Sequence, residues 1–473
     1  MTILPLNPHQ NASPEALLAF LGECRTLALR DGRAKLVSIS MVVDALDPLA
    51  VLEAIFEPSE PHFYAERPAT ATAIAGAEIA IEFEAHGPTR FVEVQRWMQE
   101  TLEHTIAVGD VQAPFGGPHF FSAFTFFDEV APGAAFPPAT AFVPRWQVAL
   151  AGSSTTAVAN FWVSPEVELG ALALRIWRAH QRFRQFGFRE ASQSESGERA
   201  PWKFSKRESG DYRLAVARGL SGIAAGEFSK IVLARAVDLA ADHPLHPLQM
   251  LHGLRQRFPD CYAFSFARGR GPSFIGASPE RLVRVSQGRV ETEALAGSIR
   301  RGAGASEDAA LASTLLQSEK DVREHREVLD DIVGRWRLLG LVPEFPVLPR
   351  VRRLANVQHL HTPVEARLPP GVTLLDVLAA MHPTAAVGGM PRAAALPRIQ
   401  AIEGFSRGLY AGAIGWLNAR GGGEFFVGIR SALVDGATAR IFAGAGIVRG
   451  STPEKEFAET ELKFSAMRDA LTR

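Results

Sequence analysis

Two ionisable side chains stand where ordinary packing does not require a charge. Lys230 precedes the apolar run 231–233. A lysine that loses solvent in such a run gives up its proton readily and can act as a general base. Glu280 follows the turn 276–279, and a carboxylic acid in a partly apolar pocket can keep its proton and act as a general acid. Both have an ordinary interpretation too, as a lysine at a wet sheet edge and a glutamate near a helix start.

Three further glutamates form a second group. Glu324 borders the apolar face of a predicted helix, since Val328 lies one turn further on. Glu456, Glu459 and Lys463 follow at spacings of three and four residues, so they share one stripe of the last predicted helix. Oxygen ligands of this kind suit Mg²⁺, which binds a few carboxylates together with water and substrate oxygens. A solvated helix face with internal ion pairs gives the same pattern.

Groups that could hold an anion occur late in the chain. We expect the glycine-rich segment 444–447 to end a strand just before a helix, where backbone N–H groups can hold a carboxylate. It is not a dinucleotide motif, which would need glycine in place of Arg449. Arg430 lies between strand apolars, where a guanidinium can grip a carboxylate or form a structural ion pair. Tyr410 and His359 could add hydrogen bonds, or serve as core residues.

The elements that must position these residues follow from hydrophobic periodicity. In the first half we expect a helix over 13–31, capped by Ser13, and strands over 77–84 and 120–128. In the second half the expected strands span 228–239, 262–267, 412–417, 424–433 and 440–448, and the expected helices span 247–257, 307–339 and 452–471. Many strands with helices between them predict an α/β or α+β fold class. The polar stretch 191–210 predicts a connection between an N-terminal half, 1–200, and a catalytic region, 211–473.

Composition narrows the class of protein. The 473 residues include 50 Lys+Arg and 51 Asp+Glu, a net charge of −1, which argues against a nucleic acid as the main partner. Cys24 and Cys261 provide neither a disulfide framework nor a zinc motif. Without a signal peptide or an apolar run of about 18 residues, we expect a cytoplasmic protein and no membrane span. Lysine is much less frequent than arginine in this chain, so each lysine is a candidate for a specific role.

Ten segments, in one order, carry a resemblance to a known family. They are FSKIVLAR, GASPERL, EALAGS, DVREHREVLDDIV, VQHL, HPTAAVGGMP, GLYAGAIGW, IRSALV, GAGIV and EKEFAETELK, within residues 220–470. In this order they resemble the chorismate-utilising enzymes, which include isochorismate synthase, salicylate synthase, anthranilate synthase component I and aminodeoxychorismate synthase component I. Residues 1–200 match only loosely. The resemblance implies two large β-sheets packed face to face with flanking helices, in a single chorismate-binding fold.

The resemblance also implies roles for individual residues. Lys230 matches a base that activates water, and Glu280 matches the acid that protonates the departing C4 hydroxyl of chorismate. Glu324, Glu456 and Glu459 match the ligands of Mg²⁺. The substrate-binding positions are Gly297, Ser298, His359, Tyr410, Arg430, Gly446 and Lys463. The charges agree with this assignment, because a dianionic substrate needs a cation at each end. Glutamate carboxylates can lie near the substrate's own carboxylate only if a metal ion lies between them.

The branch of the family depends on the nucleophile. The aminodeoxychorismate branch carries a nucleophilic lysine where this chain has Ala296, and the amine-forming branches lack a lysine at position 230. The resemblance therefore implies isochorismate synthase, in menaquinone or siderophore biosynthesis. Salicylate synthase, which goes on to eliminate pyruvate, is the alternative, although that branch tends to have threonine at the position of Ala386.

Two other classes of function are weaker. A non-catalytic chorismate-binding protein would have a broken acid, base or metal position, and all are filled here. A nucleotide-dependent enzyme has only the glycine-rich segment 444–450 in its favour. We expect no obligatory amidotransferase subunit, and a monomer or homodimer.

Overall fold

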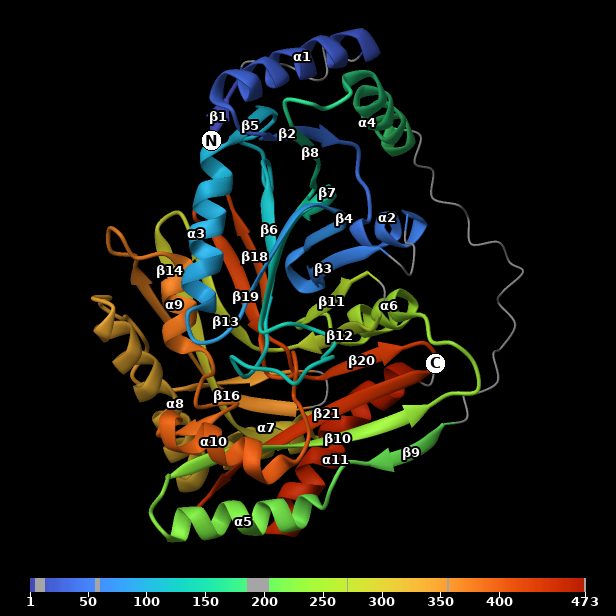
Figure 1. Cartoon of the computed structure of the whole chain (residues 1–473). Coiled ribbons are helices and arrows are strands. Elements are labelled where there is room, and N and C mark those ends of the chain that lie inside the picture. The colour runs from blue at the N-terminus through green and yellow to red at the C-terminus, as the bar shows by residue number, and fades with distance from the viewer. Residues whose placement is uncertain (5–12, 56–59, 185–203, 270, 355–356, 472–473) are drawn as a thin grey trace.

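The computed structural model describes residues 1–4, 13–55, 60–184, 204–269, 271–354 and 357–471 (Figure 1). These residues form 21 strands and 11 α-helices, which confirms the predicted α/β class. Helix α1 (Pro14–Asp31) has the predicted cap, since the Ser13 side chain accepts a hydrogen bond from the backbone N–H of Ala16. Most of the predicted connection 191–210 lies outside the described residues, and β9 (Ser205–Glu208) occupies its described end.

Hydrogen-bonded pairs join all described strands into one network that forks at β7 (Ala139–Ala151). The first arm leaves β7 through β4 (Thr72–Ala85), β3 (Pro61–Arg67), β11 (Tyr262–Arg268), β12 (Ser273–Ser278), β20 (Ser431–Asp435), β21 (Thr438–Val448) and β10 (Lys230–Ala240), with β9 and β17 (Gly389–Met390) beside β10. The second arm leaves it through β6 (His119–Phe124), β18 (Ala413–Asn418), β19 (Gly423–Val427), β13 (Arg281–Ser286), β14 (Arg289–Arg300), β16 (Val357–Arg367) and β15 (Arg350–Arg353). A shorter branch contains β8 (Ser154–Val163), β2 (Lys35–Val43), β5 (Thr105–Gly109) and β1 (Thr2–Ile3).

Apolar side chains of the two arms pack face to face. Phe264 on β11 lies 5.0 Å, ring centre to ring centre, from Phe426 on β19, and Phe63 on β3 lies 6.3 Å from Trp416 on β18. Phe63, Phe264 and Phe426 are fully buried, and removing each such side chain from water stabilises the fold by about 1.5–3 kcal/mol. The two sheets implied by the family resemblance are thus present as two arms of one network.

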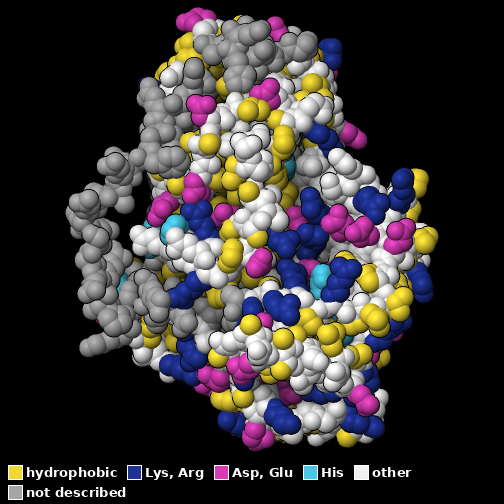
Figure 2. Space-filling model, turned by 180° about the vertical axis from the view of Figure 1, so that it is seen from behind, with side chains coloured by type: hydrophobic (Ala, Val, Ile, Leu, Met, Phe, Trp, Pro, Cys, Tyr) yellow, Lys and Arg dark blue, Asp and Glu magenta, His cyan; other side chains and the backbone are white. Residues whose placement is uncertain are grey.

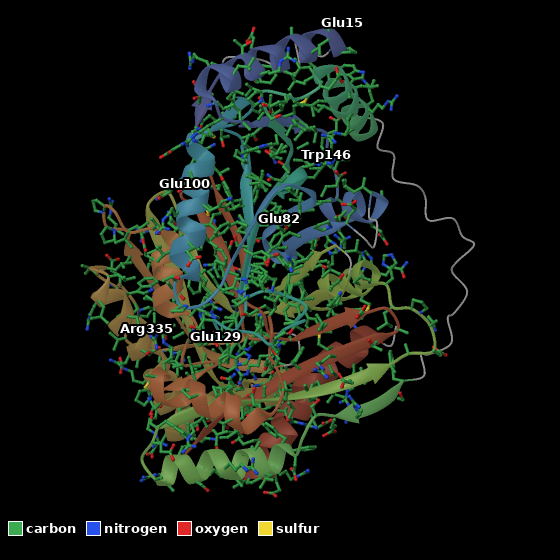
Figure 3. All side chains as sticks on the ribbon, in the orientation of Figure 1. Glu15, Glu82, Glu100, Glu129, Trp146 and Arg335 are labelled. Atoms are coloured by element: carbon green, nitrogen blue, oxygen red, sulfur yellow. The ribbon has the colours of Figure 1, made fainter. Side chains whose placement is uncertain are left out.

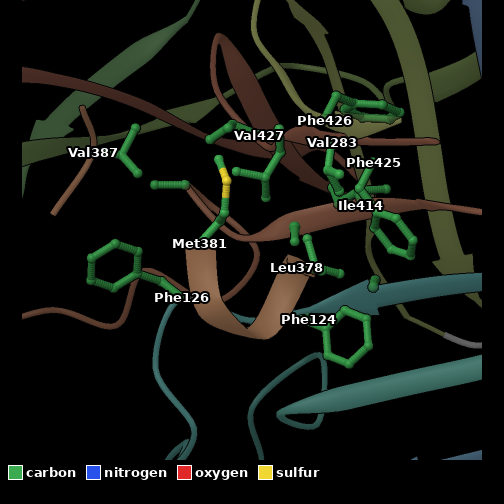
Figure 4. Close-up of a cluster of buried hydrophobic side chains, with 14 of the residues drawn as sticks. Phe124, Phe126, Val283, Leu378, Met381, Val387, Ile414, Phe425, Phe426 and Val427 are labelled. Atoms are coloured by element: carbon green, nitrogen blue, oxygen red, sulfur yellow. The ribbon is translucent and has the colours of Figure 1, made fainter. Parts of the chain in front are cut away.

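Helices cover the outside of the arms (Figure 1). They include α2 (Pro48–Ile55), α3 (Arg90–Glu103), α4 (Leu169–Arg184), α5 (Tyr212–Ala224), α6 (Pro247–Arg257), α9 (Leu374–Met381) and α10 (Arg392–Glu403). Figure 4 shows Leu378 and Met381 of α9 directed into an apolar cluster with Ile414 and Val427. Side chains fill the space between the strands in Figure 3, whereas the exposed Glu15 and Glu100 lie at the periphery.

The prediction of one helix over 307–339 is wrong, because the chain forms two helices there. α7 (Ala305–Gln317) and α8 (Glu319–Leu338) meet at Ser318, whose ψ of 107° is not helical. The Ser318 hydroxyl accepts the backbone N–H of Asp321 at 3.3 Å. Because this bond satisfies an N–H group that a helix start leaves unpaired, the second helix begins here.

The predicted strand 424–433 is also divided. β19 ends at Val427, β20 begins at Ser431, and Arg430 between them has φ +49°. Few side chains adopt this left-handed backbone conformation, which turns the chain out of the extended path. Arg430 therefore belongs to a turn and not to a strand.

Candidate active site

One cavity of about 370 Å³ collects every residue to which the sequence assigned a role. It lies between β10 and β21 of the first arm and β14 and β16 of the second, beside α8 and α11 (Pro453–Leu471). The predicted residues that line it are Lys230, Glu280, Gly297, Ser298, Glu324, His359, Tyr410, Arg430, Gly446, Glu456, Glu459 and Lys463. The fold thus brings together residues that are spread over more than 230 positions of the sequence.

Lys230, which is buried, forms an ion pair with the partly buried Glu324. Lys230 is the first residue of β10, and its side chain is 1% exposed. Its Nζ donates to Oε1 of Glu324, on α8, at 2.9 Å. Burial acts to raise the pKa of the Glu324 carboxyl, but Lys230, then Lys320 and Lys463, outweigh it, and the pKa is lowered. Glu324 is therefore a carboxylate that already has one cation beside it.

Glu280 lies in the turn between β12 and β13 and is buried. Its backbone N–H donates to Oγ of Ser278 at 3.3 Å, and its carbonyl accepts the backbone N–H of Val427 at 3.1 Å. Burial, and then the charge of Glu293, raise its pKa to about 8 against the opposing effect of nearby cations. The carboxyl group is thus protonated at neutral pH, as a general acid requires.

α11 contributes two glutamates and a lysine. Lys463 Nζ lies 2.8 Å from Glu459 Oε1 and donates to the carbonyl of Gly444 at 2.8 Å. Glu456 is buried, and its pKa is raised by burial and by repulsion from Glu459 and Glu324, against a hydrogen bond with Ser451. Three carboxylates, Glu324, Glu456 and Glu459, thus line the cavity.

This donor set suits a hard cation, since it contains only carboxylate oxygens and no thiolate or imidazole. As the side chains stand, no three His, Cys, Asp or Glu residues within the described ranges are grouped closely enough to hold a metal ion. Glu324 and Glu459 are each paired with a lysine instead. The residues fit Mg²⁺ by chemistry and charge, with lysine ammonium groups partly offsetting the carboxylates.

A second set of residues that lines the cavity is suited to a carboxylate. Nη2 of Arg430 lies 3.4 Å from Nε2 of His359, whose Nδ1 lies 2.8 Å from Oγ of Ser298. Burial, with the charges of Arg430 and Lys463, lowers the pKa of His359 to about 3, so the imidazole is neutral. Nη1 of Arg430 is buried and has no hydrogen-bond partner among the described residues. A buried guanidinium with an N–H group to spare can bind an anion.

Tyr410 stands close to this region. Its ring stacks on that of Phe442 with 5.0 Å between centres, and burial raises the pKa of its hydroxyl, which remains a hydrogen-bond donor.

Two glycines leave room for the charged groups. Gly297 has φ +72° and lies at an irregularity in the pairing of β14 with β16. A Cβ atom at Gly446 would lie 3.1 Å from both Oε1 of Glu324 and Cε of Lys230. Segment 444–447 lies at the end of β21, shortly before α11, as the sequence predicted, and Gly446 is opposite Val232 in the pairing with β10.

Among the residues of the cavity that sequence reasoning missed are two lysines. Lys320, in the first turn of α8, and Lys455, in the first turn of α11, both line it. A second hollow of about 470 Å³ shares Lys320 and Glu324 with the cavity and is also lined by Arg323 and Arg449. The rarity of lysine was the available signal, since four of the seven lysines line the cavity.

Comparison with known proteins identifies relatives that match more than nine tenths of the chain. The family model described as "Chorismate binding enzyme" matches residues 20–472. The salicylate biosynthesis isochorismate synthase of Pseudomonas aeruginosa is 38% identical over 444 residues, 93% of this chain and 91% of that protein. Isochorismate synthase MenF of Bacillus subtilis is 31% identical over 447 residues, 93% of this chain and 94% of that protein.

A solved structure agrees with these matches. MenF, the menaquinone-specific isochorismate synthase from Escherichia coli, superposes with a TM-score of 0.76 at 26% identity, covering 95% of this chain and 99% of that one. The family match spans both arms and every residue of the cavity. The chain belongs to the chorismate-binding enzymes.

Proposed function

We propose that the protein is an isochorismate synthase, which converts chorismate to isochorismate. One observation carries the proposal: a lysine and a protonated glutamic acid, Lys230 and Glu280, line the same cavity, while position 296 beside them is alanine. This set supplies a base and an acid but no amine nucleophile at position 296. The names of the two relatives above support the same activity.

The charges of the cavity suggest how chorismate would bind. Arg430 can receive the enolpyruvyl carboxylate, with Tyr410 as a neutral donor beside it. Lys463 would attract the ring carboxylate at the other side. The dianion would thereby be held by a cation at each end, which fixes the orientation of the ring between Lys230 and Glu280.

The proposed reaction exchanges one hydroxyl group for another. Lys230, in its neutral amine form, takes a proton from a water molecule whose oxygen bonds to C2 of chorismate. The ring double bonds shift, the bond from C4 to its hydroxyl breaks, and Glu280 gives its proton to the departing oxygen. One water enters and one leaves, so substrate and product are isomers. Lys230 ends with an extra proton and Glu280 without one, and the reverse reaction uses them in exchanged roles.

We also propose that Glu324, Glu456 and Glu459 hold Mg²⁺. When bound, the ion would neutralise these carboxylates and attract the ring carboxylate of the substrate. Calorimetric titration of the protein with Mg²⁺ tests this without an activity assay. Glu456→Gln should weaken binding at least tenfold, and the exposed ion-pair variant Glu227→Gln should leave it unchanged. Equal affinities of the two variants would overturn the assignment.

The function is tested by resolving the products of chorismate and Mg²⁺ by chromatography. We expect isochorismate, and Lys230→Met should lower kcat by at least about a hundredfold, the usual contribution of a general base. Lys206→Met is the control, since Lys206 is half exposed and paired with Glu208. Salicylate with pyruvate as the early products would identify a salicylate synthase, and anthranilate in the presence of ammonia would refute water as the nucleophile.

A further inference from the structure

The carboxylate of Glu293 is buried beside the turn that carries Glu280, and no step above uses it. Its side chain is 12% exposed. It accepts three hydrogen bonds: from the backbone N–H of Arg281 at 3.0 Å, from Nη1 of Arg352 at 2.8 Å and from Nε2 of His361 at 2.8 Å. Burial acts to raise its pKa, but these donors outweigh it and lower the pKa to about 2. Glu293 therefore remains ionised wherever the protein is folded and active.

The hydrogen bond to Arg281 ties this charge to the backbone of the neighbouring residue. Glu280 precedes Arg281, and its own carbonyl accepts from Val427 on the other side. The Arg281 side chain is held as well, since its Nη1 lies 2.9 Å from Glu291 and its Nε lies 3.0 Å from Glu424. The turn is therefore fixed by β14 on one side and β19 on the other, both strands of the second arm.

Several charges act on the Glu280 carboxyl group from the surrounding elements. Lys230 on β10, Lys463 on α11 and Arg352 on β15 all favour its ionised form. Glu293 on β14 opposes them, and Tyr410 faces the site as a neutral phenol. No described residue donates a hydrogen bond to the Glu280 carboxyl. These three cations act to remove the proton, whereas burial, and after it the fixed negative charge of Glu293, act to keep it.

We propose that Glu293 is a positioning residue that keeps the Glu280 carboxyl group protonated and holds its backbone in place. Arg352 and His361 stabilise the Glu293 charge in the interior. The inference deepens the proposed function, because it explains how an acid survives in a cavity that must attract a dianion. It concerns the state of Glu280 itself, so it can be tested without turnover.

The test is infrared titration of the carboxylic acid C=O band that disappears in Glu280→Gln. In the parent protein this band should titrate near pH 8. Glu293→Gln keeps the volume and an oxygen that can accept from Arg281 but removes the charge, so the midpoint should fall by about one unit or more. Glu293→Asp, which keeps the charge, should remain closer to the parent.

Glu291→Gln is the matched control, since Glu291 contacts the Arg281 side chain from the same strand. It should leave the midpoint unchanged. An unchanged midpoint in Glu293→Gln, or an equal shift in Glu291→Gln, would overturn the inference. If Glu293→Gln does not fold, Arg352→Gln gives the opposite test, and a midpoint that fails to rise would overturn the inference. Absence of isochorismate from the parent protein would instead refute the proposed function and leave the titration result intact.

Discussion

At the scale of single residues, the cavity places unlike charges in direct contact and leaves selected groups unpaired. The ammonium of Lys230 contacts Glu324, whereas Nη1 of Arg430 lacks a partner among the described residues. Glu280 is buried in neutral form. The carboxylates of a substrate could form hydrogen bonds and ion pairs with unpaired groups such as Nη1 of Arg430. For this reason we expect the cavity to favour a small dianion.

Glu280→Gln should separate activity from stability. The variant should lose at least about a hundredfold in kcat, because the amide cannot give a proton. The folded state raises the pKa of Glu280 from 4.5 to about 8, so between these pH values the unfolded chain ionises while the folded protein keeps the proton. The folded state therefore loses stability relative to the unfolded state as pH rises through this window, and it loses none below the window. Each pKa unit corresponds to about 1.4 kcal/mol, so the glutamine variant should gain on the order of a few kcal/mol at pH 8.

Urea unfolding of the two proteins at pH 4.5 and pH 8 measures this effect. The gain should be confined to the higher pH. A loss of stability at pH 8 would contradict a buried, neutral Glu280.

Gly446→Ala should inactivate the enzyme with little loss of stability. The new methyl group would lie 3.1 Å from Glu324 Oε1 and Lys230 Cε, so it would displace the ends of two flexible side chains and no backbone. We expect kcat to fall more than tenfold while the urea midpoint changes little. Gly253→Ala in α6 is the control, since nothing lies within 4 Å of its added methyl group. Full activity of the Gly446 variant would refute the contact.

At the scale of elements, the break between α7 and α8 sets the position of Glu324. Ser318→Ala should remove the bond to the N–H of Asp321 and destabilise the protein by about 1 kcal/mol, the usual value of a helix cap. It should also weaken Mg²⁺ binding, since Glu324 lies in the second turn of α8. Urea unfolding and calorimetry measure the two effects. The exposed Ser306→Ala in α7 should show neither, and a capping role is wrong if both variants behave alike.

The sequence predicted the elements better than their interruptions. Apolar periodicity located β10 and α11 to within two residues, because burial of one face dictates the pattern. The periodicity predicted α7 and α8 as a single helix, because a helix interior tolerates one serine. The capping bond of Ser318 depends on where the chain turns, which the local pattern does not show. The turn at Arg430 was missed for the same reason: nothing in the local pattern indicates a positive φ at an arginine.

The site was predicted mainly through the order of its motifs. Single residues such as Glu456 had ordinary alternatives, and only the fold shows that they line one cavity. Lys320 and Lys455 were given no role, because both side chains are exposed. Lys320 lies outside the ten motifs, and Lys455, although it lies within EKEFAETELK, had no role implied by the resemblance. The role of Glu293 was equally hidden, since it depends on partners from strands far apart in the sequence.

At the scale of the whole molecule, charge is balanced and mixed. Figure 2 shows Lys and Arg side chains interspersed with Asp and Glu over one face, in keeping with a net charge of −1. Among the described residues, no helix is both long and apolar enough to cross a membrane. Because the net charge is close to zero, attraction of the proposed dianionic substrate depends on local groups such as Lys320, Arg323 and Arg449 around the second hollow.

The double variant Lys320→Gln, Arg323→Gln should raise KM several-fold at low salt and leave kcat nearly unchanged. The difference from the parent should shrink at about 0.5 M salt, where charges are screened beyond a few ångströms. Steady-state kinetics across ionic strengths measures this, with Lys206→Gln as the control. A difference in KM that does not depend on salt would exclude electrostatic attraction.

The pairing of β10 has a consequence for how the protein is made. β10 begins with Lys230, and its neighbour along its whole length is β21, roughly 200 residues later; β6 and β18 are roughly 290 residues apart. A chain still emerging from the ribosome must therefore carry open, apolar strand edges until its last fifth is synthesised. Folding of this enzyme should be slow and sensitive to aggregation, and no incomplete chain can hold a working site.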